Sequence, residues 1–221
     1  MKQRRRIILA SGSPRRRELL TQAGLDFCIK TADVDETPTV KEPAAVVEEL
    51  SRRKAEAVAE ERRTGAGQTD ERIVAGTACG FEPDASGALI VAADTIVALD
   101  GEILGKPRDV EDAVRMLKEL SGRTHEVFTG VTVLRETGGD RVRDAVTFSA
   151  GTRVTFYPLT EEEIRDYVAS GEPMDKAGAY GIQGLGARLV ERIEGDYNNV
   201  VGFPLAHFLR ILMDMGELTI E

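Results

Sequence analysis

The amino-acid sequence predicts an α/β fold built around a mixed β-sheet. Strand and helix patterns alternate along the chain, which favours an α/β architecture. Two long strand patterns follow each other directly, so part of the sheet is expected to be antiparallel rather than doubly wound. The length of 221 residues and the hydrophobic content of 42% fit one large domain, residues 1–221, or two tightly joined lobes.

The first expected element is a short buried strand over Arg6–Ser11. It leads into a helix with Ser13 as its N-cap and Pro14 as its first residue, a position where the missing proline N–H costs nothing. Gly24 is expected to end this helix, because glycine adopts the left-handed conformation of a C-terminal cap. A second strand is expected over Phe27–Thr31.

A polar loop over Thr31–Pro43 then separates the second strand from a helix over Ala44–Arg63, whose apolar residues recur with helical periodicity. Thr64–Gly87 is rich in Gly, Thr and Ala, and it is interpreted as a loop or surface insertion. A strand is expected over Leu89–Ala98, and Asp100-Gly101 is expected to turn it back into a hairpin.

The second half of the chain contains the longest strand patterns. A helix over Val110–Leu120 precedes strands over Val127–Leu134 and Val142–Phe156, which are expected to be antiparallel and joined near Gly138-Gly139.

Three further segments complete the chain. Thr160 and Glu163 form a capping-box pattern for a helix that runs to Ala169. Pro173–Val201 is glycine-rich and expected to be irregular, and a closing helix is expected over Pro204–Met215.

Composition excludes several classes of function. The net charge of −9 disfavours binding to nucleic acid or to anionic membranes. Two cysteines and two histidines cannot form a disulfide scaffold, a cysteine-rich zinc site or a three-histidine metal site. A metal would therefore be held mostly by oxygen ligands, which favours Mg²⁺ or Mn²⁺.

The beginning of the chain does not resemble a secretory signal. Only Ile7–Ala10 are apolar between two basic stretches, whereas the apolar region of a signal peptide needs about 7–15 residues. A cytoplasmic location is the expectation.

Three consecutive arginines, Arg15–Arg17, fall in the first turn of the first helix. Basic residues are unfavourable there, because a helix N-terminus carries partial positive charge. A bound anion would remove this conflict, and a strand–glycine–helix junction is a common phosphate site. Phosphate binding is therefore favoured over the alternative, in which the arginines are simply solvated.

Lys54 lies on the apolar side of its helix. Val47, Leu50, Ala57 and Val58 are expected to form the buried stripe, and Lys54 falls within it. A lysine in that position must either extend to solvent or contact an anion, and both alternatives remain open.

Asp94 interrupts an apolar strand. A carboxylate there is costly unless it binds a metal, a cation or backbone donors. Asp94 together with Glu36 could hold Mg²⁺ or position a water for attack, and the alternative is a structural carboxylate that caps a turn.

The segment from Asp175 to Gly186 contains four glycines that would allow a ligand to approach the backbone closely, although this signal is weak by itself. The segment Gly101–Pro107 has the wrong spacing for a phosphate-binding P-loop. Lys106, considered alone, is an exposed loop lysine.

Several motifs together are more specific than any one of them. In order, they are LASGSPRRRELL at 9–20, ADTIV at 93–97, GKPR at 105–108, GEPMDKAGAYGIQG at 171–184 and GDYNNVVGFP at 195–204. This set closely resembles the Maf family of nucleoside triphosphate pyrophosphatases, also known as septum formation inhibitors. The stretch over residues 64–87 is longer than expected for the family.

The resemblance implies hydrolysis of a nucleoside triphosphate between its α- and β-phosphates, with a divalent metal, Mg²⁺ or Mn²⁺. It implies an elongated, two-lobed architecture with a strongly curved mixed sheet and the active site in the cleft, and a homodimer is common. It also implies removal of modified pyrimidine nucleotides and a link to arrested cell division.

The resemblance also assigns roles to individual residues. Asp94 resembles the general base that activates water and a metal ligand, and Glu36 resembles a metal or water ligand. The residues expected to contact the phosphates are Ser11, Ser13, Arg16, Lys54 and Lys106.

Three positions distinguish the branches of the family. Arg15, Thr95 and Gln183 match the branch that acts on dTTP and UTP, rather than the branch that acts on 7-methyl-GTP. A glutamine amide both donates and accepts, which suits the O4 and N3–H edge of uracil or thymine.

Two alternatives from other classes remain. One is a nucleotide-binding regulator of septum formation with little catalysis, and the other is an interaction protein whose arginines bind acidic partners.

Overall fold

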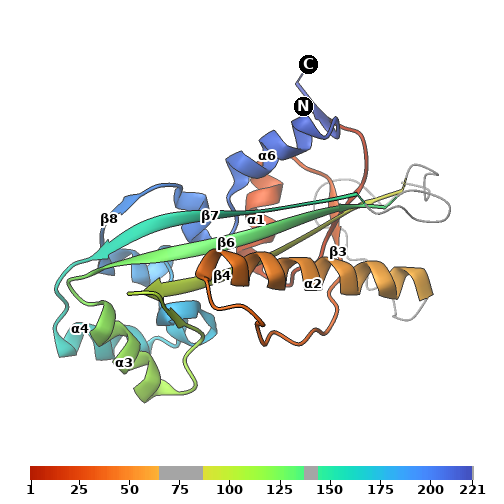
Figure 1. Ribbon diagram of the computed structural model, residues 1–221. Helices are drawn as coiled ribbons and strands as arrows, with labels where there is room; N and C mark the ends of the chain where they lie inside the picture. Colours follow the sequence, from red (N-terminus) through yellow and green to blue (C-terminus); the bar gives the residue numbers. More distant parts are fainter. Residues whose placement is uncertain (65–86, 137–143, 221) are drawn as a thin grey trace.

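The computed structural model describes residues 1–64, 87–136 and 144–220. Within them the main sheet has seven strands in the order β3-β2-β4-β6-β7-β8, with β5 paired to β4 (Figure 1). Its strands are β2 (Ile7–Leu9), β3 (Phe27–Ile29), β4 (Leu89–Leu99), β5 (Glu102–Leu104), β6 (Thr124–Arg135), β7 (Asp144–Phe156) and β8 (Val190–Glu194). β2 runs parallel to β3 and β4, whereas the other pairings are antiparallel, so the expectation of a mixed α/β sheet is confirmed.

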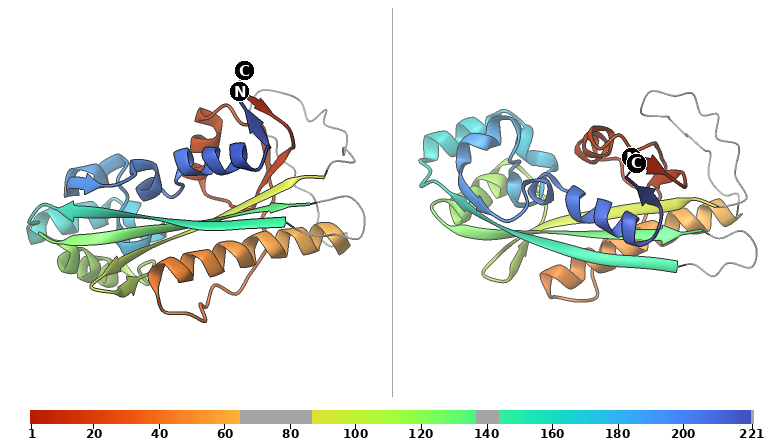
Figure 2. Two further views of the ribbon diagram at one scale, coloured as in Figure 1. Left: turned by 45° about the horizontal axis from the view of Figure 1, so that its top comes forward. Right: turned by 90° about the horizontal axis from the view of Figure 1, so that it is seen from above.

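Helices cover both faces of the sheet. They are α1 (Pro14–Gln22), α2 (Pro43–Thr64), α3 (Val110–Leu120), α4 (Glu161–Ala169), α5 (Tyr197–Val201) and α6 (Leu205–Asp214), with 3₁₀ turns η1 (Glu172–Asp175), η2 (Ala177–Ala179) and η3 (Gly184–Leu189). α2 lies along one face, and α1 and α6 lie on the other (Figure 1). The two termini lie side by side (Figure 2), where β1 (Lys2–Gln3) pairs with β9 (Leu218–Thr219).

The two largest of the four hydrophobic clusters in the described residues lie toward opposite ends of the long strands. One large cluster packs α1 and α6 on β2 and β4 and includes Phe203 and Phe208. The other packs α3 and α4 against the opposite ends of β6 and β7 and includes Phe156 and Tyr167. The shape is elongated, because β4, β6 and β7 extend between these ends (Figure 2).

Local sequence signals located most elements correctly. Asp100 and Gly101 adopt positive φ angles in the β4–β5 turn, and Gly24 does so after α1. The capping box of Thr160 and Glu163 is present at α4. No helix in the described part of the chain is long and apolar enough to cross a membrane.

Some expectations were wrong. The segment Pro173–Val201 is not simply irregular, because it contains η1, η2, η3, β8 and α5. Ala57 is only half-buried, while Ser51 and Ala55 occupy the interior face of α2. Ser13 occupies the N-cap position of α1, but its side chain makes no capping bond. The expected insertion, apart from its ends Thr64 and Gly87, and the Gly138-Gly139 connection lie outside the described residues.

Candidate active site

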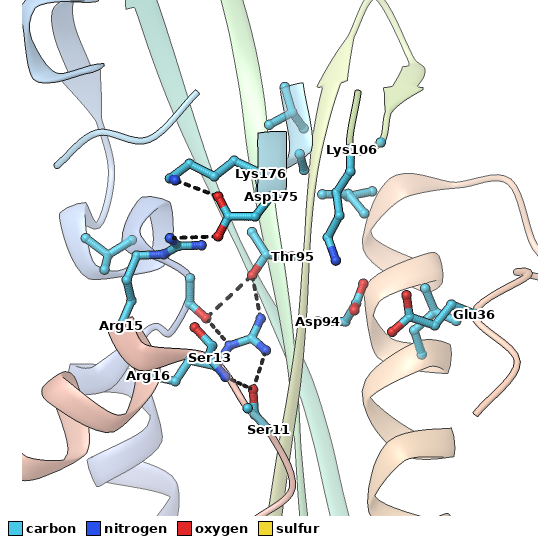
Figure 3. Close-up of a pocket in the computed structure, with 18 of the residues that line it drawn as sticks. Ser11, Ser13, Arg15, Arg16, Glu36, Asp94, Thr95, Lys106, Asp175 and Lys176 are labelled. Carbon is cyan, nitrogen blue, oxygen red and sulfur yellow. Dashed lines mark hydrogen bonds and ion pairs between the residues drawn. The ribbon is translucent and has the colours of Figure 1, made fainter. Parts of the chain in front are cut away.

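A cavity of about 1420 Å³ opens between the loops that leave β2 and β3 and the segment that contains η1 and η2. All ten residues singled out from the sequence line this cavity. They are Ser11, Ser13, Arg15, Arg16, Glu36, Lys54, Asp94, Thr95, Lys106 and Gln183. Segments distant in the sequence thus meet here (Figure 3), as expected for a ligand site at the carboxyl ends of parallel strands.

Lys54 joins two carboxylates on one wall of the cavity. Its Nζ donates to Asp94 Oδ1 at 2.5 Å and lies 2.8 Å from Glu36 Oε1. The Lys54 and Asp94 side chains are only 17% and 14% exposed, so this contact is shielded from water. The hydrogen bond from Lys54 lowers the pKa of Glu36 below its ordinary value. The apolar-side lysine therefore contacts anions supplied by the protein itself.

Gly130 sets the distance between α2 and the sheet. It is the β6 partner of Asp94, and a Cβ atom at Gly130 would lie 2.3 Å from the Val47 carbonyl oxygen of α2. No side chain fits there, so the helix backbone packs directly on the strand. The close approach brings Lys54, two turns further along α2, within reach of Asp94.

Arg16 is committed to protein contacts. Its Nε donates to the Gly202 carbonyl at 2.8 Å, and its Nη1 donates to Ser11 Oγ at 3.0 Å and to the Ala93 carbonyl at 2.9 Å. Its Nη2 donates to Thr95 Oγ1 at 3.0 Å (Figure 3). These bonds use four of the five N–H hydrogens of the guanidinium, which leaves one for a phosphate. Burial lowers the pKa of Arg16 to about 10.

The three residues expected from the sequence to determine substrate preference have different surroundings. Arg15 Nη1 lies 3.9 Å from Asp175 Oδ2 across the cavity (Figure 3). The Thr95 hydroxyl is occupied by Arg16 and by Thr129, whose Oγ1 lies 2.9 Å away. Gln183 is exposed and lines the cavity. Arg15 and Gln183 are therefore better placed than Thr95 to contact a ligand directly.

Lys106 and the two serines complete the surroundings. Lys106 is exposed, and its amino group points into the cavity toward Asp94 and Glu36 (Figure 3). Ser11 is buried and receives a hydrogen bond from Arg16, so it serves the Arg16 network. The Ser13 backbone N–H donates to Ser11 Oγ at 3.3 Å.

Sequence reasoning did not assign roles to several cavity residues. Lys176 Nζ donates to Asp175 Oδ1 at 2.7 Å and to the Glu172 carbonyl at 2.5 Å. The sequence signal for Asp175 and Lys176 was the glycine-rich segment in which they lie. That segment indicated a ligand-facing loop, but it did not indicate which charged residues support the loop. Gly130 gave no signal beyond being a glycine within a strand.

The carboxylates of the cavity suit a divalent metal that is bound together with a phosphate ligand. Among the described residues, no group of three or more His, Cys, Asp and Glu side chains could hold a metal ion. Asp94 and Glu36 supply two carboxylates that face the cavity. Mg²⁺ is commonly held by one or two carboxylates plus substrate phosphates, so this donor set fits Mg²⁺ bound with a triphosphate.

Comparison with known proteins places this geometry in context. The family model for Maf-like proteins matches residues 6–215. The chain is 49% identical to the dTTP/UTP pyrophosphatase of Agathobacter rectalis over 95% of this chain and 97% of the relative. It is 45% identical to the dTTP/UTP pyrophosphatase of Dictyoglomus turgidum, over 96% of this chain and 97% of the relative. It is 46% identical to the dTTP/UTP pyrophosphatase of Geobacter metallireducens, over 99% of this chain and 100% of the relative.

Proposed function

The chain belongs to the Maf family, and from this membership we propose that it hydrolyses dTTP and UTP to the nucleoside monophosphate and pyrophosphate. The names of the relatives support a nucleoside triphosphate pyrophosphatase. The observation that carries the assignment to this cavity is the contact of Lys54 with both Asp94 and Glu36, at a wall that faces Lys106.

The charge distribution of the cavity suits a triphosphate. Lys54 contacts both carboxylates, and the amino group of Lys106 points toward them (Figure 3). Cations positioned before the reaction stabilise negative charge as it develops on transferring phosphoryl groups. In this proposal Lys106 binds the phosphates directly, while Arg16 fixes the β2–α1 loop and contributes its remaining N–H.

In the proposed reaction, Asp94 takes a proton from the attacking water. The anhydride bond between the α- and β-phosphates breaks, one water is added, and the electron pair of the broken bond leaves with pyrophosphate. Before substrate binds, Lys54 holds the Asp94 carboxylate in place through its 2.5 Å contact. A base positioned in this way contributes roughly 10²–10⁴-fold to the rate.

We further propose that Asp94 and Glu36 hold a divalent metal together with the substrate phosphates. When bound, such a metal neutralises phosphate charge and polarises a phosphoryl oxygen. Lys54 occupies both carboxylates in this structure, so substrate binding would require it to move its contacts toward the phosphates.

Base selection is proposed to reside in Gln183 and Arg15, with Thr95 acting through the Arg16 network. The amide of Gln183 can donate to O4 and accept from N3–H of uracil or thymine, whereas a cationic side chain has no acceptor for N3–H. The homodimer, the cytoplasmic location, the removal of modified nucleotides and the link to septum formation remain predictions.

Pyrophosphate release from dTTP, UTP, CTP, GTP and 7-methyl-GTP tests this function, with Mg²⁺ or Mn²⁺ and with chelator. We expect turnover of dTTP and UTP that requires metal. Equal or faster turnover of 7-methyl-GTP would instead assign the chain to the other branch. Nucleotide binding by calorimetry without any release would favour the binding regulator.

A further inference from the structure

Gln183 lies in a short loop with little regular structure of its own. This Gln183 loop, Gly181–Gly186, follows η2 and includes the first three residues of η3, and its residues Gly181–Gly184 line the cavity. The backbone of Gln183 is extended, and Gly184 has a φ of +64°. Such a loop can hold a side chain in one place only if other residues fix its backbone.

Two side chains hold the backbone of this loop on both sides of Gln183. The Glu172 carboxylate accepts from the Leu185 N–H at 3.0 Å and from the Gly186 N–H at 3.2 Å. The Tyr167 hydroxyl donates to Glu172 Oε1 at 3.0 Å and accepts from the Gly181 N–H at 3.2 Å. Tyr167 belongs to α4 and is fully buried, so the loop is anchored to the core.

Two glycines of the loop pack closely against these two residues. A Cβ atom at Gly184 would lie 2.8 Å from Glu172 Oε2, and one at Gly186 would lie 2.7 Å from the Tyr167 hydroxyl. The backbone thus approaches both polar groups more closely than any side chain would allow.

The electrostatics keep both groups in the protonation states that the contacts need. Burial opposes ionisation of Glu172, but the amide hydrogen bonds from Leu185 and Gly186 outweigh it and lower its pKa. Burial raises the pKa of Tyr167, so its hydroxyl keeps the proton that it donates to Glu172.

The same segment also reaches Arg15. Glu172 begins η1 and Asp175 ends it, and Lys176 donates to the Glu172 carbonyl and to the Asp175 carboxylate. Asp175 then faces Arg15 at 3.9 Å. One turn of 3₁₀ helix therefore connects the support of Gln183 with the partner of Arg15.

We propose that Glu172 and Tyr167 are positioning residues for base selection, which hold the Gln183 loop at the distance needed to read a pyrimidine edge. The inference rests on the proposed function, because it assumes that Gln183 faces the base. Neither residue takes part in the bond-breaking step, since both act on the loop backbone.

The direct test is Glu172→Gln, which keeps the size of the side chain but replaces one acceptor oxygen by an amino group. We expect KM for dTTP to rise about tenfold, with kcat changed less than about threefold. The preference for dTTP over CTP should fall by a similar factor. The inhibition constant of inorganic tripolyphosphate, which has no base, should stay within about twofold of wild type.

A second variant separates positioning from folding. Tyr167→Phe keeps the buried ring and removes only the hydroxyl. We expect KM for dTTP to rise about threefold and the preference for dTTP over CTP to fall by a similar factor. The matched control is Asp166→Asn, which removes the negative charge from the exposed partner of Arg188 of η3, now at 2.6 Å. This substitution alters a contact on the exposed side of η3, so the preference between bases should stay unchanged.

A double variant tests whether Glu172 acts through Gln183. In a Gln183→Ala background, Glu172→Gln should cause no further loss of base preference, because contacts that act as one unit are not additive. Independent losses that multiply would overturn the proposal. So would a tripolyphosphate constant that rises as much as KM in both single variants. If wild type hydrolyses none of the nucleotides, it is the proposed function that fails.

Discussion

The two walls of the cavity are built in different ways. The wall proposed to carry out hydrolysis, called the hydrolytic wall, is formed by Lys54, Asp94 and Glu36. It depends on regular elements, because α2 packs on the sheet at Gly130 and β4 carries Asp94. The wall proposed to bind the base, called the base wall, is formed by Arg15 and the Gln183 loop. It depends on glycines and on side chains that hydrogen-bond to the backbone. Damage to the first wall should therefore lower kcat, and damage to the second should change which nucleotide is bound.

The largest effect is expected at Asp94. Replacing Asp94 by Asn keeps the shape but removes the base, so kcat for dTTP should fall roughly 10²–10⁴-fold. The affinity for dTTP, measured by calorimetry with metal, should change much less. An Asp94→Asn protein that retains more than a tenth of wild-type kcat would assign the base to another residue.

Lys54 should come next. Replacing Lys54 by Met leaves Asp94 and Glu36 without their shared cation, and kcat/KM should fall roughly 10²-fold. Because Lys54 lowers the pKa of Glu36, its removal should raise that pKa, so Glu36 would become protonated at a higher pH than in wild type. Carbon NMR titration of the Glu36 carboxyl group measures this shift, and an unchanged pKa would contradict the contact.

Gly130 tests whether packing of α2 sets the geometry of the hydrolytic wall. Gly130→Ala forces α2 away from β6 and should lower stability by about 1–3 kcal/mol, as overpacking does. kcat should fall about tenfold, because Lys54 moves with the helix. Gly105→Ala, where nothing lies within 4 Å of the added carbon, is the control for stability in thermal unfolding. Equal stability of the two variants would show that α2 does not depend on Gly130.

Gln183 should give the smallest change in rate and the clearest change in preference. Gln183→Ala should lower kcat/KM for dTTP about tenfold and kcat/KM for CTP much less. The lost hydrogen bond weakens binding only of the base that makes it. Steady-state kinetics with both nucleotides measures the ratio. An unchanged ratio would remove Gln183 from the base wall.

Sequence reasoning found residues whose positions conflict with simple local rules. Lys54 lies on the apolar side of a helix, Asp94 interrupts an apolar strand, and the Asp100-Gly101 turn follows from local chemistry alone. Each of these conflicts or patterns can be recognised within about one turn or one strand of sequence.

What the sequence did not reveal depends on contacts between distant segments. β8 and α5 are five residues each, too short to show a clear period. The commitment of Arg16 to Gly202 and Ala93 requires three segments to meet. Glu172 is an ordinary glutamate in the sequence, and only the folded chain brings it to the amides of Leu185 and Gly186.

The division of work between the two walls is tested most directly by inorganic tripolyphosphate, a ligand with phosphates and no base. Its inhibition constant would be measured for wild type, Lys54→Met and Gln183→Ala with dTTP as substrate. The constant should rise about tenfold or more in Lys54→Met and stay within about twofold of wild type in Gln183→Ala. A rise of similar size in both variants would contradict separate walls for the phosphates and the base.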